Sequence, residues 1–303
     1  MWRALQLAKN GEGHVSPNPR VGAVIVAHGR IIGEGFHRKF GGPHAEVNAI
    51  NSVKSVDRPL LAEATIYVTL EPCAHYGKTP PCAELIVKTG IPEVIVGALD
   101  PNPLVAGKGI KILEGAGIKV ETGILAEESR ELNRRFFKAH TTSRPWIILK
   151  WAQSADGFMA AIDDKGSTQP VKFSNPVSIV WMHKERANVD AITVGKNTLR
   201  IDNPRLDTRH WTGKSPIKKL IDSHINCKDF VEELRKEGVT SLMVEGGASL
   251  LHSFIKDDLF DEIRIETSPH KLGNGLSSPP LPQNLVLRDY FKCRDNIISI
   301  FRR

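Results

Sequence analysis

The chain has 303 residues, of which 41% are hydrophobic and 25% charged, and its formal net charge is +7 at pH 7. This composition is typical of a globular enzyme, the length suits two domains, and no apolar run approaches the length of a membrane span. The positive charge favours anionic partners such as phosphorylated metabolites or a dinucleotide, whereas the dispersal of the basic residues argues against nucleic acid. The first residues are not those of a signal peptide, and four cysteines do not make a disulfide framework, so we expect a cytoplasmic protein.

The first elements in chain order are a short helix and a hairpin. Residues 2–9 have the apolar spacing of an amphipathic helix. A proline-rich loop over residues 15–20 then leads to two predicted strands, 21–26 and 31–36, which are close enough in sequence to form a hairpin.

The stretch from His44 to Cys82 carries the strongest chemical signal in the chain. It opens with Pro43-His44-Ala45-Glu46 and closes with a loop in which Cys73 follows one proline and Cys82 follows two. One imidazole and two thiolates are three of the four ligands of a catalytic zinc ion, and the fourth position then stays open for water. We therefore predict a hydrolytic zinc site formed by His44, Cys73 and Cys82.

Glu46 is close enough to this site to handle protons. Two thiolates and a neutral imidazole give an uncharged zinc centre, which acidifies water less than an all-histidine site, so a nearby base matters. Positions i and i+2 of a helix lie about 200° apart, so we expect His44 at the very start of its helix. The prolines before Cys73 and Cys82 are typical of helix starts, where exposed N–H groups stabilise a thiolate. A closed structural zinc site would instead need a fourth protein ligand, for which His75 is the candidate in the loop.

The rest of the first half alternates strands and helices. A buried strand, residues 65–70, delivers Cys73 at its carboxyl end, where ligand sites of open α/β sheets lie. The further predicted elements are a helix from Cys82, strands 93–99 and 118–121, and helices 108–114 and 126–139. This alternation is typical of a layered α/β domain with a largely parallel sheet.

A domain boundary is predicted near residues 141–145, dividing the chain into residues 1–142 and 143–303. The second domain is predicted to begin with a strand, residues 145–152. No GxGxxG fingerprint follows a strand, so a Rossmann domain is not predicted.

Two glycine turns follow predicted strands of the second half. Strand 191–194 runs into Gly195, and strand 241–244 runs into Gly246-Gly247 before a helix. Both turns can aim backbone N–H groups at a phosphate. A glycine after a strand is more often a plain turn, so each turn alone is weak support for a nucleotide site.

These motifs resemble those of the bifunctional deaminase/reductases of riboflavin biosynthesis. The resemblance rests on the eight residues between Cys73 and Cys82, on Ser16-Pro17-Asn18-Pro19, and on the run that begins Asp100-Pro101-Asn102-Pro103. Most nucleoside and nucleic-acid deaminases have only two residues between these cysteines. Residues 149–157 and 244–251 are similar to the reductase half of the family, so the resemblance covers nearly the whole chain.

The resemblance implies two domains and two reactions. A cytidine-deaminase-like, three-layer α/β/α domain would use zinc to remove the 2-amino group of a diaminopyrimidinone that carries a phosphoribosylamino arm. A dihydrofolate-reductase-like α/β domain would then use NADPH to reduce the ribosyl arm to a ribityl chain. The resemblance also implies a homodimer formed through the reductase half, with small phosphorylated pyrimidines rather than nucleic acid or membrane as partners.

Position by position, the resemblance implies roles for individual residues. His44, Cys73 and Cys82 would bind zinc, and Glu46 would shuttle protons. The residues that would hold the deaminase substrate are Asn18, His37, His75 and Lys78. Those that would contact NADPH are Ala152, Thr198, Asp202, Ser223, Gly247, Ser249 and Leu250. Those that would contact the reductase substrate are Arg186, Leu206, Arg209 and Glu245.

Plainer roles stand beside several of these assignments. The four residues assigned to the deaminase substrate would otherwise be solvated surface residues. Arg186 and Arg209 would form a phosphate clamp or, alternatively, exposed ion pairs. Asp202 would equally suit a turn or a helix cap.

The sequence departs from the family's pattern in three places. First, it begins close to the first helix. Second, residues 168–175 replace a family segment, so cofactor and substrate contacts are not carried over there. Third, a longer family segment that holds at least one strand is missing between Asn226 and Asp229. A deaminase with a degenerate reductase half is therefore an alternative function. Two rival functions stand beside it: a nucleic-acid-editing zinc deaminase, which would bind RNA in a salt-dependent way, and a non-catalytic zinc-stabilised module, in which Glu46 would turn away from the metal.

Overall fold

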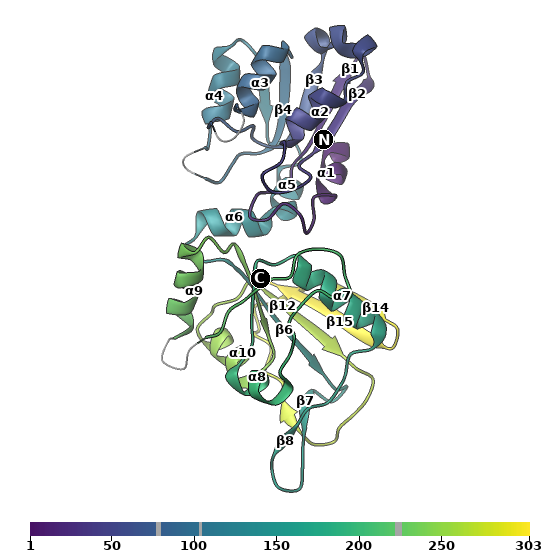
Figure 1. Cartoon of the computed structure of the whole chain (residues 1–303), viewed down its shortest axis with the longest axis vertical. Helices are drawn as coiled ribbons and strands as arrows, with labels where there is room; N and C mark the ends of the chain where they lie inside the picture. Colours follow the sequence, from purple (N-terminus) through teal and green to yellow (C-terminus); the bar gives the residue numbers. More distant parts are fainter. Residues whose placement is uncertain (77–79, 103–104, 222–225) are drawn as a thin grey trace. The chain divides into compact units, whose positions relative to one another are not determined.

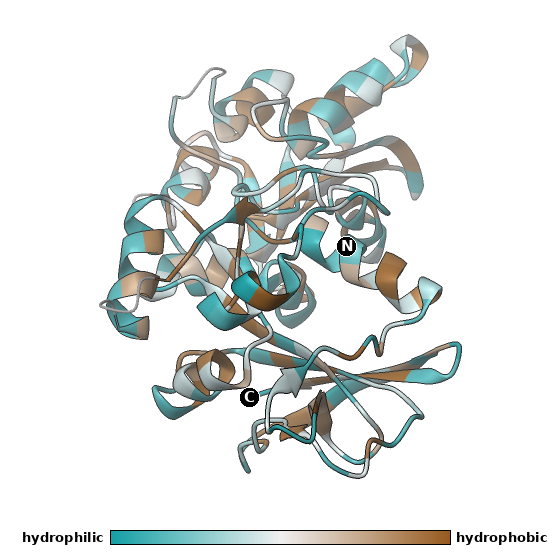
Figure 2. Cartoon of the chain, turned by 60° about the horizontal axis from the view of Figure 1, so that its bottom comes forward, coloured by the Kyte–Doolittle hydropathy of each residue, from teal (hydrophilic) through white to brown (hydrophobic). Residues whose placement is uncertain are grey.

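The computed structural model describes residues 1–76, 80–102, 105–221 and 226–303. It divides into two compact units, Met1–Thr141 and Thr142–Arg303 (Figure 1). The division falls one residue before the predicted boundary. Each unit has its own main sheet, and hydrophobic (brown) segments occur on both strands and helices in Figure 2. Within the described residues, no helix has both the length and the apolar character needed to cross a membrane.

The first unit contains a five-stranded sheet in the order β2-β1-β3-β4-β5. The strands are β1 (Gly22–Ala27), β2 (Arg30–Phe36), β3 (Thr65–Leu70), β4 (Glu93–Ala98) and β5 (Lys119–Thr122). β3, β4 and β5 are parallel, as predicted, whereas β1 runs antiparallel to both β2 and β3. The predicted hairpin is confirmed, since a short turn joins only antiparallel neighbours.

Helices cover both faces of this sheet. One core contains residues of α2 (Ala45–Ser52), the 3₁₀ helix η1 (Ser55–Glu63), α3 (Cys82–Thr89) and α4 (Lys108–Gly115). On the other side, α1 (Trp2–Lys9) packs in a separate cluster against Leu132, the last residue of α5 (Ala126–Leu132), and against Leu125 just before that helix. The three-layer α/β/α arrangement that the resemblance implied is thus confirmed.

The single helix predicted over residues 126–139 is wrong. The structure has two helices there, α5 and α6 (Arg134–Thr141), with Asn133 between them. The buried Asn133 side chain accepts the backbone N–H of Arg20 at 2.8 Å and donates to the Arg20 carbonyl at 2.8 Å. This pairing with a distant loop ends α5, because an asparagine bonded to backbone in this way leaves the regular helix.

The second unit has a seven-stranded sheet in the order β10-β9-β11-β6-β12-β15-β14 and a small sheet in the order β13-β7-β8. The strands of the large sheet are β6 (Trp146–Gln153), β9 (Ala191–Thr193), β10 (Ile217–Lys218), β11 (Ser241–Glu245), β12 (Glu262–Thr267), β14 (Val286–Cys293) and β15 (Asn296–Arg302). The small sheet contains β7 (Phe158–Ile162), β8 (Thr168–Gln169) and β13 (Leu276–Ser277). From β10 to β12 the large sheet is parallel, and β15 and β14 then add antiparallel strands.

The central strand β6 is buried on both faces, which is typical of a parallel sheet covered by helices. Ile147 and Leu149 face one core, shared with α9 (Cys227–Lys236) and α10 (Ala248–Lys256). Ile148 faces a second core, on the side where α8 (Lys196–Asp202) contributes Leu199. α7 (Pro176–Ala187) lies on this second side, with Met182 against Lys150 of β6. Parallel strands therefore end together at one edge of the sheet, between two helical layers.

Candidate active sites

The three predicted zinc ligands come from the ends of three elements. His44 immediately precedes α2 with extended backbone (φ −72°, ψ 169°), and Cys82 is the first residue of α3. Both expected helix starts are confirmed. Cys73, in contrast, lies in an irregular loop after β3, so the expectation of a helix start there is wrong. Its sulfur instead accepts the backbone N–H of Cys82 at 3.3 Å, so the start of α3 serves both thiols.

The ligand atoms are spaced as a zinc ion requires. His44 Nδ1 lies 3.5 Å from Cys73 Sγ and 3.4 Å from Cys82 Sγ, and the ligand atoms of this group all lie within 4.8 Å of one another. Tetrahedral zinc with bonds of about 2.0 Å to nitrogen and about 2.3 Å to sulfur needs nitrogen and sulfur about 3.5 Å apart. His75 is exposed and does not belong to the group, so the described residues supply no fourth ligand for a closed structural site.

Glu46 is 3% exposed and borders the same cluster. Burial, reinforced by the charge of Cys73, raises the pKa of Glu46 to about 7. The hydrogen bond with Cys82 lowers the pKa of Cys73 to about 4, and the same bond together with burial raises the pKa of Cys82. The hydrogen bond with Cys73 also raises the pKa of His44. The cluster thus shares protons that a bound cation would displace, because thiolates bind metal deprotonated.

Two of the predicted deaminase-substrate residues lie beside the zinc ligands. His37 is buried, and its ring meets that of His44 edge-on with 5.4 Å between centroids. Asn18 Nδ2 lies 3.1 Å from His37 Nε2. His75 is exposed in the loop after Cys73. Lys78 lies outside the described residues.

Glu71 is a buried residue of this site that the sequence analysis missed. Its carboxylate accepts the backbone N–H groups of Asp100, Gly107 and Gly109 at 3.2, 3.0 and 3.1 Å. It thereby fixes the loop after β4 against the turn that carries Cys73. A Cβ on Gly109 would lie 2.0 Å from the Pro72 carbonyl oxygen, so this approach requires glycine. The sequence could have indicated Glu71, because it is an acidic residue directly after a buried strand.

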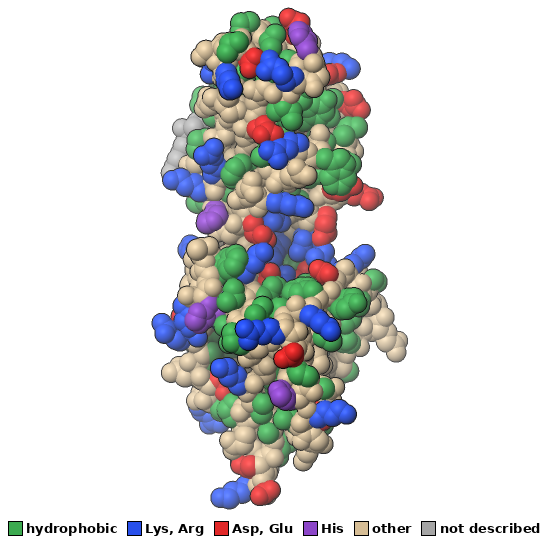
Figure 3. Space-filling view, turned by 90° about the vertical axis from the view of Figure 1, so that its right-hand side faces the viewer, with side chains coloured by type: hydrophobic (Ala, Val, Ile, Leu, Met, Phe, Trp, Pro, Cys, Tyr) green, Lys and Arg blue, Asp and Glu red, His purple; other side chains and the backbone are tan. Residues whose placement is uncertain are grey.

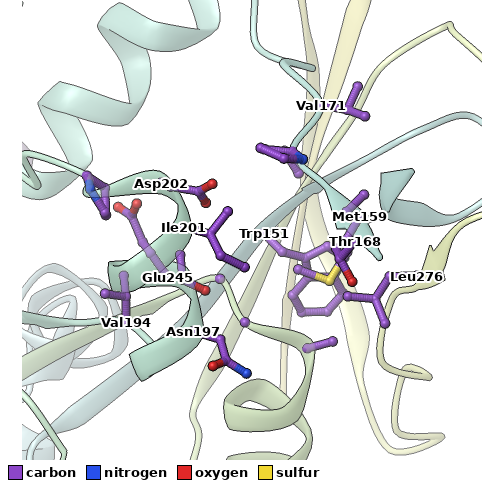
Figure 4. A pocket seen from close by; sticks show the side chains of 18 of the residues that line it. Trp151, Met159, Thr168, Val171, Val194, Asn197, Ile201, Asp202, Glu245 and Leu276 are labelled. Carbon is purple, nitrogen blue, oxygen red and sulfur yellow. The ribbon is translucent and has the colours of Figure 1, made fainter. Parts of the chain in front are cut away.

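In the second unit, a cavity of about 470 Å³ lies at the carboxyl ends of β6, β9 and β11 (Figure 4). It is lined by five predicted cofactor residues, Ala152, Thr198, Asp202, Gly247 and Ser249, and by two predicted substrate residues, Leu206 and Glu245. Leu250 lines a neighbouring cavity of about 520 Å³, which shares Thr198, Gly247 and Ser249 with the first. Ser223 lies outside the described residues. The structure therefore brings most of the predicted reductase residues to one edge of the sheet, where open α/β sheets bind ligands.

The turn before α10 is shaped by glycine. Gly247 has φ +71°, and a Cβ there would lie 3.1 Å from Thr198 Oγ1. Only glycine adopts this backbone conformation without a steric cost. Its missing side chain also leaves room for Thr198, which follows the turn after β9. The backbone can therefore border the cavity directly.

Arg186 and Arg209 are each bonded to a carboxylate of the protein. Arg186 forms a two-bonded ion pair with Glu245 at 2.8 and 2.7 Å, and it also donates to the Asp207 carbonyl at 3.2 Å. Although burial opposes ionisation of Glu245, Arg186 outweighs it and holds the pKa of that carboxyl below its ordinary value. Arg209 donates to the Asp207 carboxylate at 2.6 Å. The phosphate clamp formed by the two arginines stays a prediction.

The cavity walls include residues that sequence reasoning did not single out. Lys150 and Trp151 of β6 line it, as do Asn197 and Ile201 of α8. Lys150 is 7% exposed, and its Nζ lies 4.0 Å from a carboxylate oxygen of Glu266. The sequence could have indicated these four residues, because they lie close in sequence to the predicted cofactor residues Ala152 and Thr198.

The segment that departs from the family pattern, residues 168–175, forms part of the wall of the cavity. Thr168, Pro170, Val171 and Phe173 all line it, together with Met159 and Leu276 of the small sheet. Figure 4 shows Thr168, Met159 and Leu276 close together on one side and Asp202 and Glu245 on the other. The small sheet therefore closes the side of the cavity opposite α8.

Comparison with known proteins gives matches in both units. Residues 1–98 match the cytidine and deoxycytidylate deaminase zinc-binding region, and residues 145–227 and 217–297 match the RibD C-terminal domain. The riboflavin biosynthesis protein RibD of Aquifex aeolicus is 38% identical over 91% of this chain and 88% of its own length. The Escherichia coli protein of the same name is 31% identical over 97% of this chain and 94% of its own.

Solved structures agree with these matches. The diaminohydroxyphosphoribosylaminopyrimidine deaminase/5-amino-6-(5-phosphoribosylamino)uracil reductase of Thermotoga maritima superposes with a TM-score of 0.89 at 32% identity, covering 100% of this chain and 97% of that one. RibD of Acinetobacter baumannii superposes with a TM-score of 0.85 at 31% identity, covering 99% and 97%. The two C-terminal sequence matches overlap at residues 217–227.

Proposed function

The chain belongs to the RibD family of riboflavin-biosynthesis proteins, and we propose how its own residues carry out the family's two reactions. It is a bifunctional enzyme with a zinc-binding deaminase domain and an NADPH-using reductase domain. One observation carries the assignment of the deaminase residues: the ligand atoms of His44, Cys73 and Cys82 lie within 4.8 Å of one another, beside a buried glutamate.

The proposed deaminase substrate is diaminohydroxyphosphoribosylaminopyrimidine. When bound, zinc supplies a water molecule acidified for attack on the ring carbon that carries the 2-amino group. A carbon–oxygen bond forms there, the carbon–nitrogen bond breaks, and the amino group leaves as ammonia. We assign to Glu46 the proton that passes from the attacking water to the leaving amine. Its burial next to Cys73 and Cys82 supports this role.

Replacing Glu46 by Gln tests this assignment. Glu46→Gln keeps the shape and loses the carboxylate, so ammonia release from the diaminopyrimidine should fall at least about a hundredfold. NADPH oxidation on the already deaminated substrate should be unchanged. Glu34→Gln is the matched control, because Glu34 forms an ion pair with Arg3 at the surface. Loss of both activities in Glu46→Gln would contradict the separation of the two sites.

The second reaction is proposed to take place in the cavity of the second unit. NADPH supplies the hydride, and the protein supplies orientation and charge. We assign the cofactor to Thr198, Gly247 and Ser249, and the ribosyl arm of the substrate to Leu206 and Glu245. The grouping of these residues around one cavity of about 470 Å³ supports the assignment.

An active reductase half is part of the proposal, against the alternative of a degenerate one. The seven-stranded sheet is continuous, and the cavity is present, although a segment of the family pattern is missing after Asn226. Incubation with the diaminopyrimidine, following ammonia and NADPH separately, decides between them. Ammonia release without NADPH oxidation, even when the deaminated substrate is supplied, would leave a deaminase alone.

A homodimer formed through the reductase unit is also proposed. β14 lies at the end of the seven-stranded sheet, and Val286, Leu287 and Tyr290 on it are 50%, 49% and 66% exposed. Apolar side chains on a sheet edge favour association unless they are covered. Light scattering should give the mass of a dimer for the wild type and of a monomer for Leu287→Lys, with Val56→Lys in the first unit as control. A monomeric wild type would refute the dimer.

The proposed compartment is the cytoplasm. All four cysteines are free thiols in the structure, and Cys73 and Cys82 have to stay reduced to bind metal. Fractionation of producing cells, followed by thiol labelling of the unfolded protein, would test this expectation.

A further inference from the structure

A row of buried charges crosses the central strands of the second unit. Lys150 of β6 lies opposite Glu245 of β11 and opposite Arg264 of β12, and all three residues are at most 8% exposed. Glu245 already has a partner in Arg186, through bonds of 2.8 and 2.7 Å. Arg264 has a partner in Glu262, at 2.5 Å. Both neighbours of Lys150 in the sheet are therefore engaged, although a buried ammonium needs a counter-charge.

Glu266 supplies that counter-charge. It lies on β12 two residues beyond Arg264, on the same face of the strand, and its Oε2 is 4.0 Å from Lys150 Nζ. Within the described residues, no other carboxylate lies within this distance of Lys150 Nζ. The ammonium also donates to Met182 Sδ at 3.4 Å, but a thioether is a weak acceptor. Lys150 therefore depends on Glu266 for the balance of its charge.

The carboxylate of Glu266 is itself held by two hydrogen bonds. Glu266 is 1% exposed; its Oε1 accepts Asn296 Nδ2 at 2.6 Å, and its Oε2 accepts Ser174 Oγ at 2.7 Å. Asn296 Nδ2 also donates to the Phe173 carbonyl at 3.0 Å, so both of its partners are acceptors and the orientation of the amide is fixed. Glu266 is thus held in one position, because turning away would leave buried donors without partners.

This network reaches the reductase cavity at two points. Lys150 and Phe173 both line the cavity of about 470 Å³, whereas Glu266 lies behind them and does not belong to its described lining. Phe173 is part of segment 168–175, which departs from the family pattern and forms part of the cavity wall. One buried carboxylate therefore links the cation on β6 to that wall segment.

Without the charge of Glu266, Lys150 would turn to the carboxylate opposite it, Glu245. Glu245 borders the same cavity as Lys150. Burial opposes ionisation of Glu245, and its pKa is nevertheless held below the ordinary value by Arg186 first and by the charge of Lys150 as well. An unbalanced Lys150 would compete with Arg186 for Glu245 and so change the wall where the ribosyl arm is proposed to bind.

We propose that Glu266 is a positioning residue of the reductase site, which takes up the charge of Lys150 so that Glu245 stays paired with Arg186 at the wall of the cavity. The inference rests on the proposed function, because it takes Glu245 to border the reductase substrate. Glu266 acts through Lys150 and does not touch the substrate itself. Its hydrogen bonds with Ser174 and Asn296 hold it in place for this role.

Glu266→Gln tests the role of the charge alone. The Gln oxygen can accept the bond from Asn296 and the Gln amide can donate to Ser174 Oγ, so the wall segment stays tied while the charge is lost. NADPH oxidation on the deaminated substrate should lose about tenfold in kcat/KM, mainly through KM for the pyrimidine, with KM for NADPH nearly unchanged. Ammonia release should be unaffected. An unchanged KM for the pyrimidine overturns the proposal.

A double-mutant cycle with Lys150→Met tests whether the effect passes through Lys150. If it does, Glu266→Gln causes no further loss of kcat/KM in the Lys150→Met background. Denaturant titration gives a readout independent of activity. Each single variant leaves one buried charge unpaired, so each should unfold at a lower denaturant concentration than the double variant, which has neither charge. Losses of kcat/KM that multiply, or losses of stability that add, overturn the proposal.

Glu262→Gln is the matched control, because Glu262 is a buried carboxylate of the same strand that pairs with Arg264 and Arg302. This variant should lose stability but keep its KM for the pyrimidine. An equal rise of KM in Glu262→Gln and Glu266→Gln would mean that any buried charge of β12 has this effect, and this overturns the proposal. If the wild-type protein oxidised no NADPH on the deaminated substrate, the proposed function would fail, while the stability of the double variant would still decide whether Glu266 balances Lys150.

Discussion

The zinc cluster and the reductase cavity are built in opposite ways. Three ligands between His44 and Cys82, at the ends of neighbouring elements, bring their atoms within 4.8 Å of one another. The reductase cavity draws on segments from Lys150 to Leu276, including a separate small sheet. On the face drawn in Figure 3, Lys and Arg side chains are spread over the surface. A metal site depends on particular atoms at particular distances, so residue identity reveals it. A cofactor cavity depends on shape and backbone, which many sequences can supply.

The two sites also differ in how their charges are balanced. At the zinc cluster, the described residues place two thiols and a buried carboxylate close together, and deprotonated thiols favour a cation. In the second unit, the charges of Arg186 and Glu245 already neutralise each other. The first site is therefore incomplete without its ion, whereas the second can form before its ligands arrive. Substitutions at each site test this contrast.

The largest effect is expected at the zinc cluster. Cys82→Ser removes one of the three proposed protein ligands, so zinc content should fall to background and ammonia release should be lost. NADPH oxidation on deaminated substrate should persist, because the second unit has its own core. Metal analysis and the two assays measure this, with Cys227→Ser, a buried cysteine of the second unit, as control. Retention of zinc in Cys82→Ser would remove this cysteine from the ligand set.

A large loss of stability is expected from breaking the buried ion pair. Arg186→Ala leaves the Glu245 carboxylate buried and unpaired, which should cost the second unit about 3–5 kcal/mol of unfolding free energy near pH 7. Arg205→Ala removes an arginine whose side chain is 73% exposed and should cost little. Denaturant titration of both variants measures the difference. Equal losses would show that burial does not govern this pair.

The pH dependence of that loss has a definite sign. In the wild type, Arg186 keeps the pKa of Glu245 below its ordinary value, so the stability it contributes is present above the unfolded pKa of about 4.3 and lost as pH falls. In Arg186→Ala, burial raises that pKa instead. The deficit of the variant should therefore be greatest at neutral pH and shrink toward about pH 4, and a constant deficit would contradict the mechanism.

The smallest effect is expected from the glycine turn. Gly247→Ala places a Cβ at φ +71° and 3.1 Å from Thr198 Oγ1, so NADPH affinity should fall about tenfold, measured by fluorescence titration. Gly238→Ala carries the same kind of strain, at φ +86°, with nothing within 4 Å of the added Cβ. It should lose stability but not NADPH affinity. Equal affinity losses would mean that strain alone, rather than the cavity wall, is responsible.

Local patterns predicted most of the fold. The hairpin β1–β2 and strand β3 follow from alternation and turn residues, and the helix starts at His44 and Cys82 from the spacing of Glu46 and the prolines. The failures were long-range. α5 ends where Asn133 bonds to a loop that lies far away in sequence, and Cys73 takes its N–H from α3 rather than from a helix of its own.

The grouping of His44, Cys73 and Cys82 and the presence of two domains could be inferred from the residues alone, because these features depend on residue identity and on short-range spacing. Which partner each polar group takes became clear only from the packed structure. Packing directs Arg186 to Glu245, closes the reductase cavity with the small sheet, and gives His37 a hydrogen-bond partner at each ring nitrogen. The reason is physical: a buried polar group has to find a partner, and that partner comes from whichever element packs against it.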